Sequence, residues 1–330
     1  LIILSPHSKP FFDLVTGKFQ AWYRATYGKD ITIIQDYKSS GVCAGVVSTA
    51  KGAPFPEEVV YWGGGMFYFD GSDYSMLPFY APYTSKEDAK INATYYEWPL
   101  KRVKDGKTYW YASALSTFGI IINEPVLKAA GLPVPETWDD LTKPIYRGKM
   151  VMANPQLSGS TAVIVIQQLQ LKGWEKGWEY WLKVAGNMKE FTPASYDVPT
   201  KVKLGEYPIG LGIDYYASEY KLKYTIAGAS VCSPDPIALL GGNVDPNAQA
   251  LGKIFIDWLL SKDGQATTVE GGRLPVRGDI VVPPPMENPW VKRLAIPGYN
   301  GTFEGVVKDI VTSLFYNWFI VNQAAIREAS

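Results

Sequence analysis

Short apolar runs alternate with helical segments from the first residue of this chain. The opening run LIIL precedes residues 9–27, where apolar side chains recur at helical spacing until Gly28. Two further runs, ITIIQDY and EVVYWGGG, frame a second helical segment that begins at SSG. The order strand, helix, strand, helix, strand is typical of a parallel sheet with right-handed crossovers. The first part of the chain is therefore predicted to be an α/β unit.

The same alternation returns in the middle of the chain. YASALSTFGIIIN, residues 149–153 and YPIGLGID are predicted strands, and a helix is predicted to begin near Ser158. Another helix is predicted with Asp245 as its cap, Pro246 in its first position and Gly264 at its end, and a long helical pattern follows at residues 303–329. No linker separates the two α/β parts of these 330 residues. We therefore expect two lobes joined by strands, with a cleft where the strands cross.

The charge balance argues against nucleic acid and anionic membranes as partners, and the hydropathy argues against a membrane-spanning segment. Basic and acidic residues number 32 each, so no long-range field attracts nucleic acid or an anionic membrane. No apolar run approaches the roughly 20 residues that span a bilayer. The chain begins abruptly at Leu1 with a strand-like run, which suits an exported protein whose leader or anchor was removed.

The two cysteines, Cys43 and Cys232, lack the spacing of a redox motif or a zinc site. They are either joined in one disulfide or present as two buried thiols.

Three helix starts carry small hydroxyl and glycine residues. The longest is NPQLSGSTA at residues 154–162, and the other two are SPHS and SSGVCAG. Free N–H groups and the positive end of the helix dipole point out of a first turn, and serine or threonine hydroxyls add donors. Taken singly, a serine before a helix is usually no more than a cap. Three such starts around one cleft favour a site for an oxyanion.

Tyr215 and Tyr216 directly follow the predicted strand YPIGLGID. This position is the carboxyl end of a strand, where open α/β sheets bind ligands. The pair is either packed aromatic residues or ligands of a hard trivalent cation, which would ionise a phenol of pKa about 10. Tyr220 and Tyr224 are predicted to be surface or packing residues.

His7 is the only histidine, and it follows the first predicted strand. A hydrogen-bonded structural role and a place in the cleft both stay open for it. A single histidine excludes a multi-histidine metal site. The sequence also lacks the GxSxG, HExxH and P-loop motifs, so an enzyme is not expected.

The chain resembles the extracellular solute-binding proteins of ABC importers, in the family 1 group of ferric-ion-binding and sugar-phosphate-binding receptors. The resemblance rests on PETWDDLTKPIYRGKMVMANPQLSGSTA, on GEYPIGLGIDYY, and on PIALLGGNVDPNAQALGKIFIDWLLSKDGQ followed by GGRLPVRGD. It implies a two-lobed, periplasmic-binding-protein-like α/β fold of type II with a ligand cleft between the lobes. We expect residues 1–112 plus 229–288 in one lobe and residues 113–228 plus 289–330 in the other.

The resemblance implies a receptor that captures a small solute by lobe closure. The solute would pass to a membrane permease with its ATPase, and the receptor would be periplasmic or extracellular, anchored through a removed N-terminal segment. Tyr215 and Tyr216 match the iron-coordinating pair of ferric-binding members, and His7 matches a histidine ligand. Glycines 63–65 stand where some members have a carboxylate ligand. Iron would therefore need a synergistic anion, and a small organic anion such as a phosphonate or sugar phosphate is the alternative solute.

We expect no resident cofactor, with ferric iron and its synergistic anion as the transported ligand. The expected solute-binding residues are His7, Ser8, Ser39, Ser40, Gly41, Gly63, Gly64, Ser113, Ser158, Gly159, Ser160, Thr161, Ser195, Asp214 and Tyr215, and the expected metal ligands are His7, Tyr215 and Tyr216. Two rival classes are an enzyme on the same fold and a surface protein that uses the fold for adhesion or assembly.

Overall fold

The computed structural model describes residues 1–49, 57–71, 74–242, 245–284 and 286–329.

The chain forms two compact units. Unit 1 comprises Leu1–Leu115 and Ser233–Arg293, and unit 2 comprises Ser116–Cys232 and Leu294–Ser330. The chain leaves unit 1 within strand β7 (Lys107–Ile122) and re-enters it within strand β12 (Cys232–Leu239). The lobe boundaries given above stay a prediction.

Unit 1 contains a mixed sheet in the strand order β2-β1-β3-β12. Strand β1 (Ile2–Ser5) pairs in parallel with β2 (Ile34–Tyr37) and with β3 (Glu58–Trp62), as the alternation predicted. Strand β12 pairs antiparallel with β3, and β6 pairs antiparallel with the first part of β7. The strands that the sequence did not predict here are β4 (Thr94–Tyr95), β5 (Trp98–Pro99) and β6 (Lys101–Lys104).

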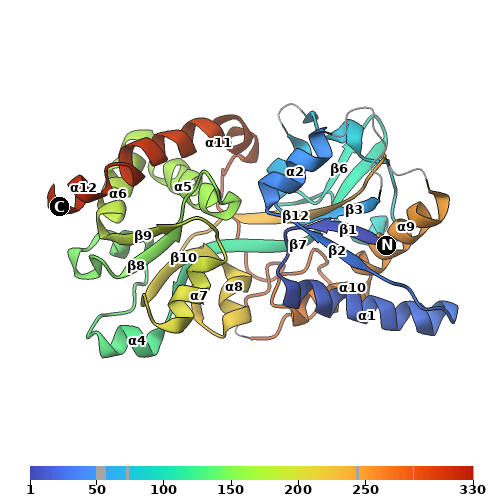
Figure 1. Ribbon diagram of the computed structural model, residues 1–330, viewed down its shortest axis with the longest axis horizontal. Coiled ribbons are helices and arrows are strands. Elements are labelled where there is room, and N and C mark those ends of the chain that lie inside the picture. The colour runs from blue at the N-terminus through green and yellow to red at the C-terminus, as the bar shows by residue number, and fades with distance from the viewer. Residues whose placement is uncertain (50–56, 72–73, 243–244, 285, 330) are drawn as a thin grey trace. The chain divides into compact units, whose positions relative to one another are not determined.

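Helices cover both faces of this sheet (Figure 1). Helix α1 (Lys9–Tyr27) packs with α9 (Pro246–Leu260) and α10 (Lys262–Glu270), whereas α2 (Ser40–Thr49) lies on the other face. Residues 50–52 of the segment expected to continue α2 lie outside the described residues. The short helices of unit 1 are α3 (Met66–Asp70) and the 3-10 turns Leu77–Phe79 and Asp88–Lys90.

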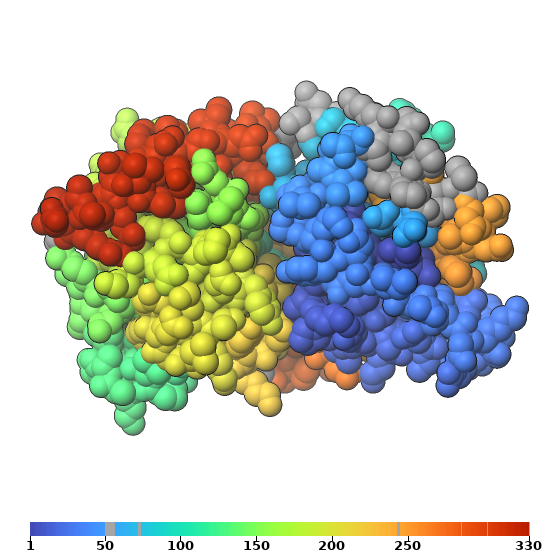
Figure 2. Space-filling view, in the orientation of Figure 1, coloured from blue at the N-terminus to red at the C-terminus, as the bar shows by residue number. Residues whose placement is uncertain are grey.

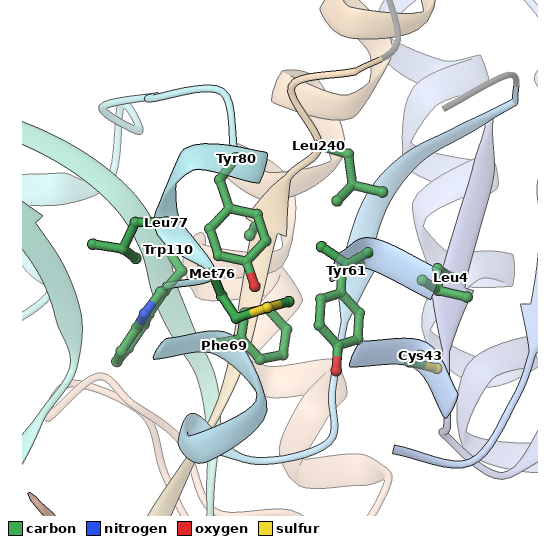
Figure 3. Close-up of a cluster of buried hydrophobic side chains, with 11 residues drawn as sticks. Leu4, Cys43, Tyr61, Phe69, Met76, Leu77, Tyr80, Trp110 and Leu240 are labelled. Atoms are coloured by element: carbon green, nitrogen blue, oxygen red, sulfur yellow. The ribbon is translucent and has the colours of Figure 1, made fainter. Parts of the chain in front are cut away.

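Consecutive residues of β3 supply the two halves of the unit 1 core, because neighbouring side chains of a strand point to opposite faces. The ring of Trp62 lies 5.7 Å from that of Phe255 in α9, measured between centroids. Tyr61 instead packs with Cys43 of α2 and with Phe69, in the cluster that Figure 3 shows.

The helix predicted to reach Gly264 ends earlier. Asp245 caps its start and Pro246 takes the first position, as predicted. The helix ends at Leu260, because Ser261 is the N-cap of α10 and its Oγ accepts a hydrogen bond from the backbone N–H of Gly264 at 3.3 Å. Gly264 therefore lies inside the next helix.

Unit 2 has its own mixed sheet. Strand β10 (Ile209–Ile213) pairs antiparallel with the last part of β7 and parallel with β8 (Met150–Ala153). Strand β9 (Met188–Thr192) pairs parallel with β8, and β11 (Lys223–Thr225) pairs antiparallel with β7. The sequence predicted β7, β8 and β10, whereas β9 and β11 were missed.

Two groups of helices cover this second sheet (Figure 1). Packed together are α5 (Gly159–Lys172), α6 (Trp174–Asn187), α11 (Gly301–Phe315) and α12 (Gln323–Ala329). Helix α7 (Asp197–Leu204) packs closely on β10, because a β-carbon at Gly210 would stand 2.7 Å from Val198. Its neighbour α8 (Asp214–Tyr220) completes this group. The remaining helical segments are α4 (Glu124–Ala129), the 3-10 turns Trp138–Thr142 and Pro144–Tyr146, and a π-helical turn at Tyr316–Ile320.

Both cysteines are buried free thiols, so the disulfide left open above is not formed. Burial raises the pKa of Cys43 to about 12 and raises that of Cys232 well above its usual value. Throughout the part of the chain described above, no helix is both long and apolar enough to cross a bilayer.

Candidate functional site

Four hydroxyl side chains meet at the start of α5 in unit 2. Ser158 is the N-cap: its Oγ accepts a hydrogen bond from the backbone N–H of Thr161 at 3.1 Å and donates one to Thr161 Oγ1 at 2.8 Å. The Oγ of Ser195 lies 2.5 Å from that of Ser158 and 3.1 Å from that of Ser160. We call Ser158, Ser160, Thr161 and Ser195 the hydroxyl cluster.

Asn154 explains why two segments of unit 2 meet at this cluster. Its backbone N–H donates to the carbonyl of Thr192 at 2.8 Å, which joins the ends of β8 and β9. Its carbonyl accepts from the backbone N–H of Ser158, and its side chain accepts from that of Gln156 at 2.9 Å. The loop before α5 is therefore held in a turn beside the segment that carries Ser195.

The chemistry of the cluster suits an oxyanion. Ser158 and Thr161 are buried, whereas Ser160 and Ser195 are partly exposed and open to a ligand. The first turn of α5 contains no acidic residue, so its N–H groups and dipole leave the site positive. Each hydroxyl can turn its proton toward an incoming oxygen.

A group of tyrosine rings adjoins the hydroxyl cluster along the chain. Tyr196 follows Ser195 directly, and its ring lies 5.6 Å from Tyr216 and 5.5 Å from Tyr220. The rings of Tyr215 and Tyr216 lie 4.7 Å apart at an interplanar angle of 67°. The chain turns into α8 immediately after β10, so the pair leaves the line of the strand. Figure 2 shows α7 and α8, in yellow, at the surface of unit 2.

Tyr196, Tyr220 and the nearby Tyr224 are held by contacts within unit 2. Burial, together with hydrogen bonds to Tyr220 and Glu219, raises the pKa of Tyr196 well above its usual value. Tyr220 Oη bonds to Thr200 Oγ1 at 2.9 Å. Burial likewise raises the pKa of Tyr224. The packing role predicted for Tyr220 and Tyr224 agrees with these contacts.

Asp214 is engaged within unit 2. Its Oδ2 accepts from the backbone N–H and the hydroxyl of Thr117 at 2.8 and 3.0 Å, and its Oδ1 accepts from the N–H of Tyr215 at 2.8 Å. These bonds fasten the start of α8 to β7. Asp214 is therefore a framework residue here, and the structure gives no support to its predicted contact with the solute.

His7 lies in a buried charged network of unit 1. Its Nδ1 is 3.1 Å from Nη2 of Arg273, and its Nε2 is 3.6 Å from Oδ2 of Asp235. Arg273 Nη1 donates to the same Asp235 oxygen at 2.8 Å. Burial, followed by the charge of Arg273, lowers the pKa of His7 well below its usual value. Because a guanidinium only donates, Nδ1 of a neutral His7 is the acceptor.

This arrangement counts against the expected role of His7 as a metal ligand. Nδ1 accepts a hydrogen bond from Arg273 Nη2, Nε2 lies 3.6 Å from Asp235 Oδ2, and the side chain is 3% exposed. The ring also stands edge-on to Trp62, with 4.4 Å between centroids. Among the described residues, no group of three or more His, Cys, Asp or Glu side chains is arranged to hold a metal ion.

The glycine loop after β3 belongs to the same network. Gly63, Gly64 and Gly65 have φ angles of 95°, 114° and 88°, in the region that favours glycine. Asp235 Oδ1 accepts from the N–H groups of Gly64 and Gly65 at 2.8 and 3.4 Å. A β-carbon on Gly63 would lie 2.4 Å from His7 Cε1. The close approach of His7 therefore explains glycine at position 63, and Asp235 uses N–H groups that were expected to face the solute.

The other residues expected in unit 1 divide into buried and accessible ones. Ser113 is 2% exposed, accepts from Trp62 Nε1 at 2.9 Å and donates to the carbonyl of Asp235 at 2.8 Å. It is an internal residue, contrary to expectation. Ser8 is the N-cap of α1. Ser39, Ser40 and Gly41 form the start of α2, where Ser39 and Gly41 are exposed.

Sequence reasoning missed Asp235 and Arg273, which organise the charged network. Their side chains meet across 38 positions of sequence, and neither belongs to a local motif. The one available signal was that each sits in an apolar segment, DPIALL and GGRLPV, where a charge requires a partner.

Known structures resemble the whole chain. The periplasmic binding protein AfuA of Actinobacillus pleuropneumoniae, with exogenous fructose-6-phosphate bound, superposes with a TM-score of 0.79 at 19% identity, over 97% of this chain and 98% of AfuA. Iron-bound HitA of Pseudomonas aeruginosa gives 0.72 at 16% identity, over 96% and 98%. These likenesses concern the fold, and they confirm the predicted periplasmic-binding-protein-like architecture.

Sequence comparison identifies the family to which the chain belongs. The phosphoglycerate transport regulatory protein PgtC of Salmonella typhimurium is 34% identical over 171 residues, which cover 50% of this chain and 42% of PgtC. The family model for bacterial extracellular solute-binding proteins matches residues 76–301, more than half of the chain. The chain therefore belongs to the family of bacterial extracellular solute-binding proteins.

Proposed function

We propose that this protein is the solute-binding receptor of an ABC importer, and that its solute is a small organic anion held through a phosphate-like head by the hydroxyl cluster. The observation that carries the proposal is the meeting of Ser158, Ser160, Thr161 and Ser195 at the start of a helix of 14 residues. Hydroxyl donors and a helix N-terminus together bind phosphate groups without a cationic side chain.

The names of two similar proteins support this choice of solute. PgtC is named for phosphoglycerate transport, and the AfuA structure contains fructose-6-phosphate. Both compounds are phosphorylated organic anions. Their shared phosphate group is the group that the chemistry of the hydroxyl cluster fits.

We assign the organic part of the solute to Tyr215. Its ring is partly exposed and packs against Tyr216, and a phenol offers both an apolar face and a hydroxyl. The proposed solute-binding residues of unit 2 are Ser158, Gly159, Ser160, Thr161, Ser195 and Tyr215. The expected roles of Ser39, Ser40 and Gly41 in unit 1 stay a prediction. His7, Gly64, Ser113 and Asp214 are left out because they are engaged internally.

Ferric iron with a synergistic anion is the second candidate. The contact between the rings of Tyr215 and Tyr216 favours it, and HitA was solved with iron bound. The buried network around His7 counts against it, as does the absence of a carboxylate at glycines 63–65. In this case the hydroxyl cluster would hold the anion and the tyrosines would bind the metal.

The wider role follows from the family. Its members are solute-binding proteins, which agrees with the expectation that the chain is not an enzyme. As part of the proposal, the partners are the small solute and a membrane permease with its ATPase. The proposed location is the periplasm or the cell exterior. Equal numbers of acidic and basic residues argue against nucleic acid as a partner.

Calorimetric titration of the ligand-free protein tests the proposal. We expect heat of binding with 3-phosphoglycerate or fructose 6-phosphate, and a loss of at least about tenfold in affinity in a Ser160→Ala, Ser195→Ala double variant. Ser218→Ala changes an exposed serine of α8 and serves as the control. The proposal fails if no phosphorylated anion binds while ferric citrate gives a visible charge-transfer band that Tyr215→Phe, Tyr216→Phe removes.

A further inference from the structure

The segment that carries Ser195 joins strand β9 to helix α7 (Figure 1). Its residues 193–196 form bends and turns and belong to neither element. The Oγ of Ser195 is nevertheless placed 2.5 Å from that of Ser158 and 3.1 Å from that of Ser160. A side chain on a connecting segment is held in one place only where the backbone that carries it is held. The contacts that fix this segment therefore bear on the hydroxyl cluster.

Thr192, the last residue of β9, holds the segment from one side. Its side chain is 0% exposed, and its Oγ1 donates a hydrogen bond to the carbonyl of Ala194 at 2.8 Å. The backbone carbonyl of Thr192 accepts from the N–H of Asn154 at 2.8 Å, in the loop before α5. Thr192 thus bonds to both of the segments that supply the hydroxyl cluster.

The first turn of α7 holds the same segment from the other side. The N–H of Ala194 donates to Asp197 Oδ2 at 3.2 Å, and the carbonyl of Ala194 accepts from the N–H of Asp197 at 3.2 Å. The carbonyl of Ser195 accepts from the N–H of Val198 at 3.3 Å. The side-chain bond from Thr192 is the shortest of these four bonds. Thr192 is also more buried than Asp197, so water competes less for its hydroxyl.

We infer that Thr192 is a positioning residue for the solute, whose hydroxyl fixes the segment that carries Ser195. Thr192 does not itself touch the solute, because its side chain is buried and its proton is directed to Ala194. It acts by holding Ser195 Oγ beside Ser160 Oγ before the solute arrives. Donors that are already in place bind more tightly, because less conformational freedom is lost on binding. This inference rests on the proposed function and deepens it.

Two substitutions separate the hydroxyl of Thr192 from its methyl group. Thr192→Val removes the hydroxyl and keeps the shape of the side chain, whereas Thr192→Ser keeps the hydroxyl and removes a buried methyl group. In calorimetry with 3-phosphoglycerate, we expect Thr192→Val to weaken binding about three- to tenfold and Thr192→Ser to stay within about twofold of the unchanged protein. Thr192→Ser should nevertheless unfold at a lower temperature, because it leaves a small cavity. Affinities that follow the unfolding temperature instead of the hydroxyl would make Thr192 a core residue only.

Ser195→Ala provides a second arm of the test. Because Thr192 acts through Ser195, adding Thr192→Val to Ser195→Ala should weaken binding by less than about twofold. An equal loss with and without the Ser195 hydroxyl would overturn the inference. Thr268→Val in α10 of unit 1 is the matched control, since Thr268 is 1% exposed and its Oγ1 donates to the carbonyl of Gly264 at 3.0 Å. It should leave the affinity unchanged.

The outcomes separate this inference from the proposed function. If the unchanged protein binds no phosphorylated anion, both are overturned. If it binds one and Thr192→Val binds as tightly, the proposed function stands and Thr192 is not a positioning residue. Thr192→Val should fold, because the carbonyl of Ala194 keeps its bond from the N–H of Asp197. Thr192→Ala takes its place should it fold poorly, and the same weakening relative to Thr192→Ser is expected.

Discussion

The charged network of unit 1 and the hydroxyl cluster of unit 2 use polar side chains in opposite ways. In the network, Arg273 donates to Asp235 and to His7, and Asp235 also holds the glycine loop. In the cluster, neutral hydroxyls meet at a helix start and keep the freedom to turn their protons. Charge in this protein therefore supports the framework, whereas uncharged donors are left for an anion. A balanced net charge is therefore compatible with an anion receptor.

Loss of the Asp235 side chain should lower the stability of the protein more than any other change considered below. Asp235→Ala leaves Arg273 buried without its ion-pair partner, so we expect the free energy of unfolding to fall by about 3–5 kcal/mol. Urea denaturation at neutral pH measures it. Asp13→Ala, which breaks the exposed pair with Lys9, is the control and should cost no more than about 1 kcal/mol. Equal effects of the two changes would mean that the network is not a framework.

Glu304 of unit 2 is a buried acid whose hydrogen-bond partner is a neutral tyrosine, whereas the buried Asp235 of unit 1 is paired with a charged arginine. Tyr299 Oη donates to its Oε2 at 2.7 Å, and burial raises the pKa of Glu304 from 4.5 to about 7. The folded protein therefore keeps this proton up to a higher pH than the unfolded chain does. Stability should fall by about 3 kcal/mol as the pH rises from 4.5 through 7, and stay at the lower value above.

Glu304→Gln removes that ionisation and should flatten this part of the stability profile. Thermal unfolding at a series of pH values from 4 to 9 measures the difference between the variant and the unchanged protein. Parallel profiles for the two would show that the carboxyl does not ionise in this range.

The buried Ser158 and the partly exposed Ser160 should differ in what they contribute to the stability of the protein. Ser158→Ala removes the N-cap of α5 and should lower the free energy of unfolding by about 1 kcal/mol. Ser160→Ala removes a partly exposed hydroxyl and should stay within about 0.5 kcal/mol of the unchanged protein. Urea denaturation of both variants distinguishes them. A larger loss for Ser160→Ala would give that residue a structural role instead of a binding role.

The smallest effect concerns the two thiols. Cys43 and Cys232 are buried, and burial raises the pKa of both, so alkylation of the folded protein at neutral pH should be slow. Alkylation in denaturant without reductant should modify two cysteines, as mass spectrometry would show. No modification would mean that a disulfide exists.

Local signals in the sequence predicted much of the fold. Gly28 ends α1 in the left-handed conformation, Asp245 caps α9, and Ser158 caps α5, each as expected. Such signals act within one helical turn and can be read from neighbouring residues. Strands β4, β5 and β11 have only two or three residues, β6 and β9 carry charged side chains, and α10 directly follows α9, so their patterns gave no separate signal.

The candidate site was less predictable, because its geometry depends on distant residues. The oxyanion character of the loop before α5 was visible in the sequence. The burial of His7 was not, since it follows from Asp235 and Arg273, which lie more than 200 positions away. The engagement of Asp214 with Thr117, 97 positions earlier, was equally hidden. Tertiary partners, and not local pattern, decided which candidates face inward.

The most direct test of the central claim is a calorimetric titration with 3-phosphoglycerate of the unchanged protein and of two double variants. The first variant is Ser160→Ala, Ser195→Ala, and the second is Tyr215→Phe, Tyr216→Phe. We predict a loss of at least about tenfold for the serine variant and less than about fivefold for the tyrosine variant, because the hydroxyl cluster binds the anionic head. Unchanged binding in the serine variant would contradict the account.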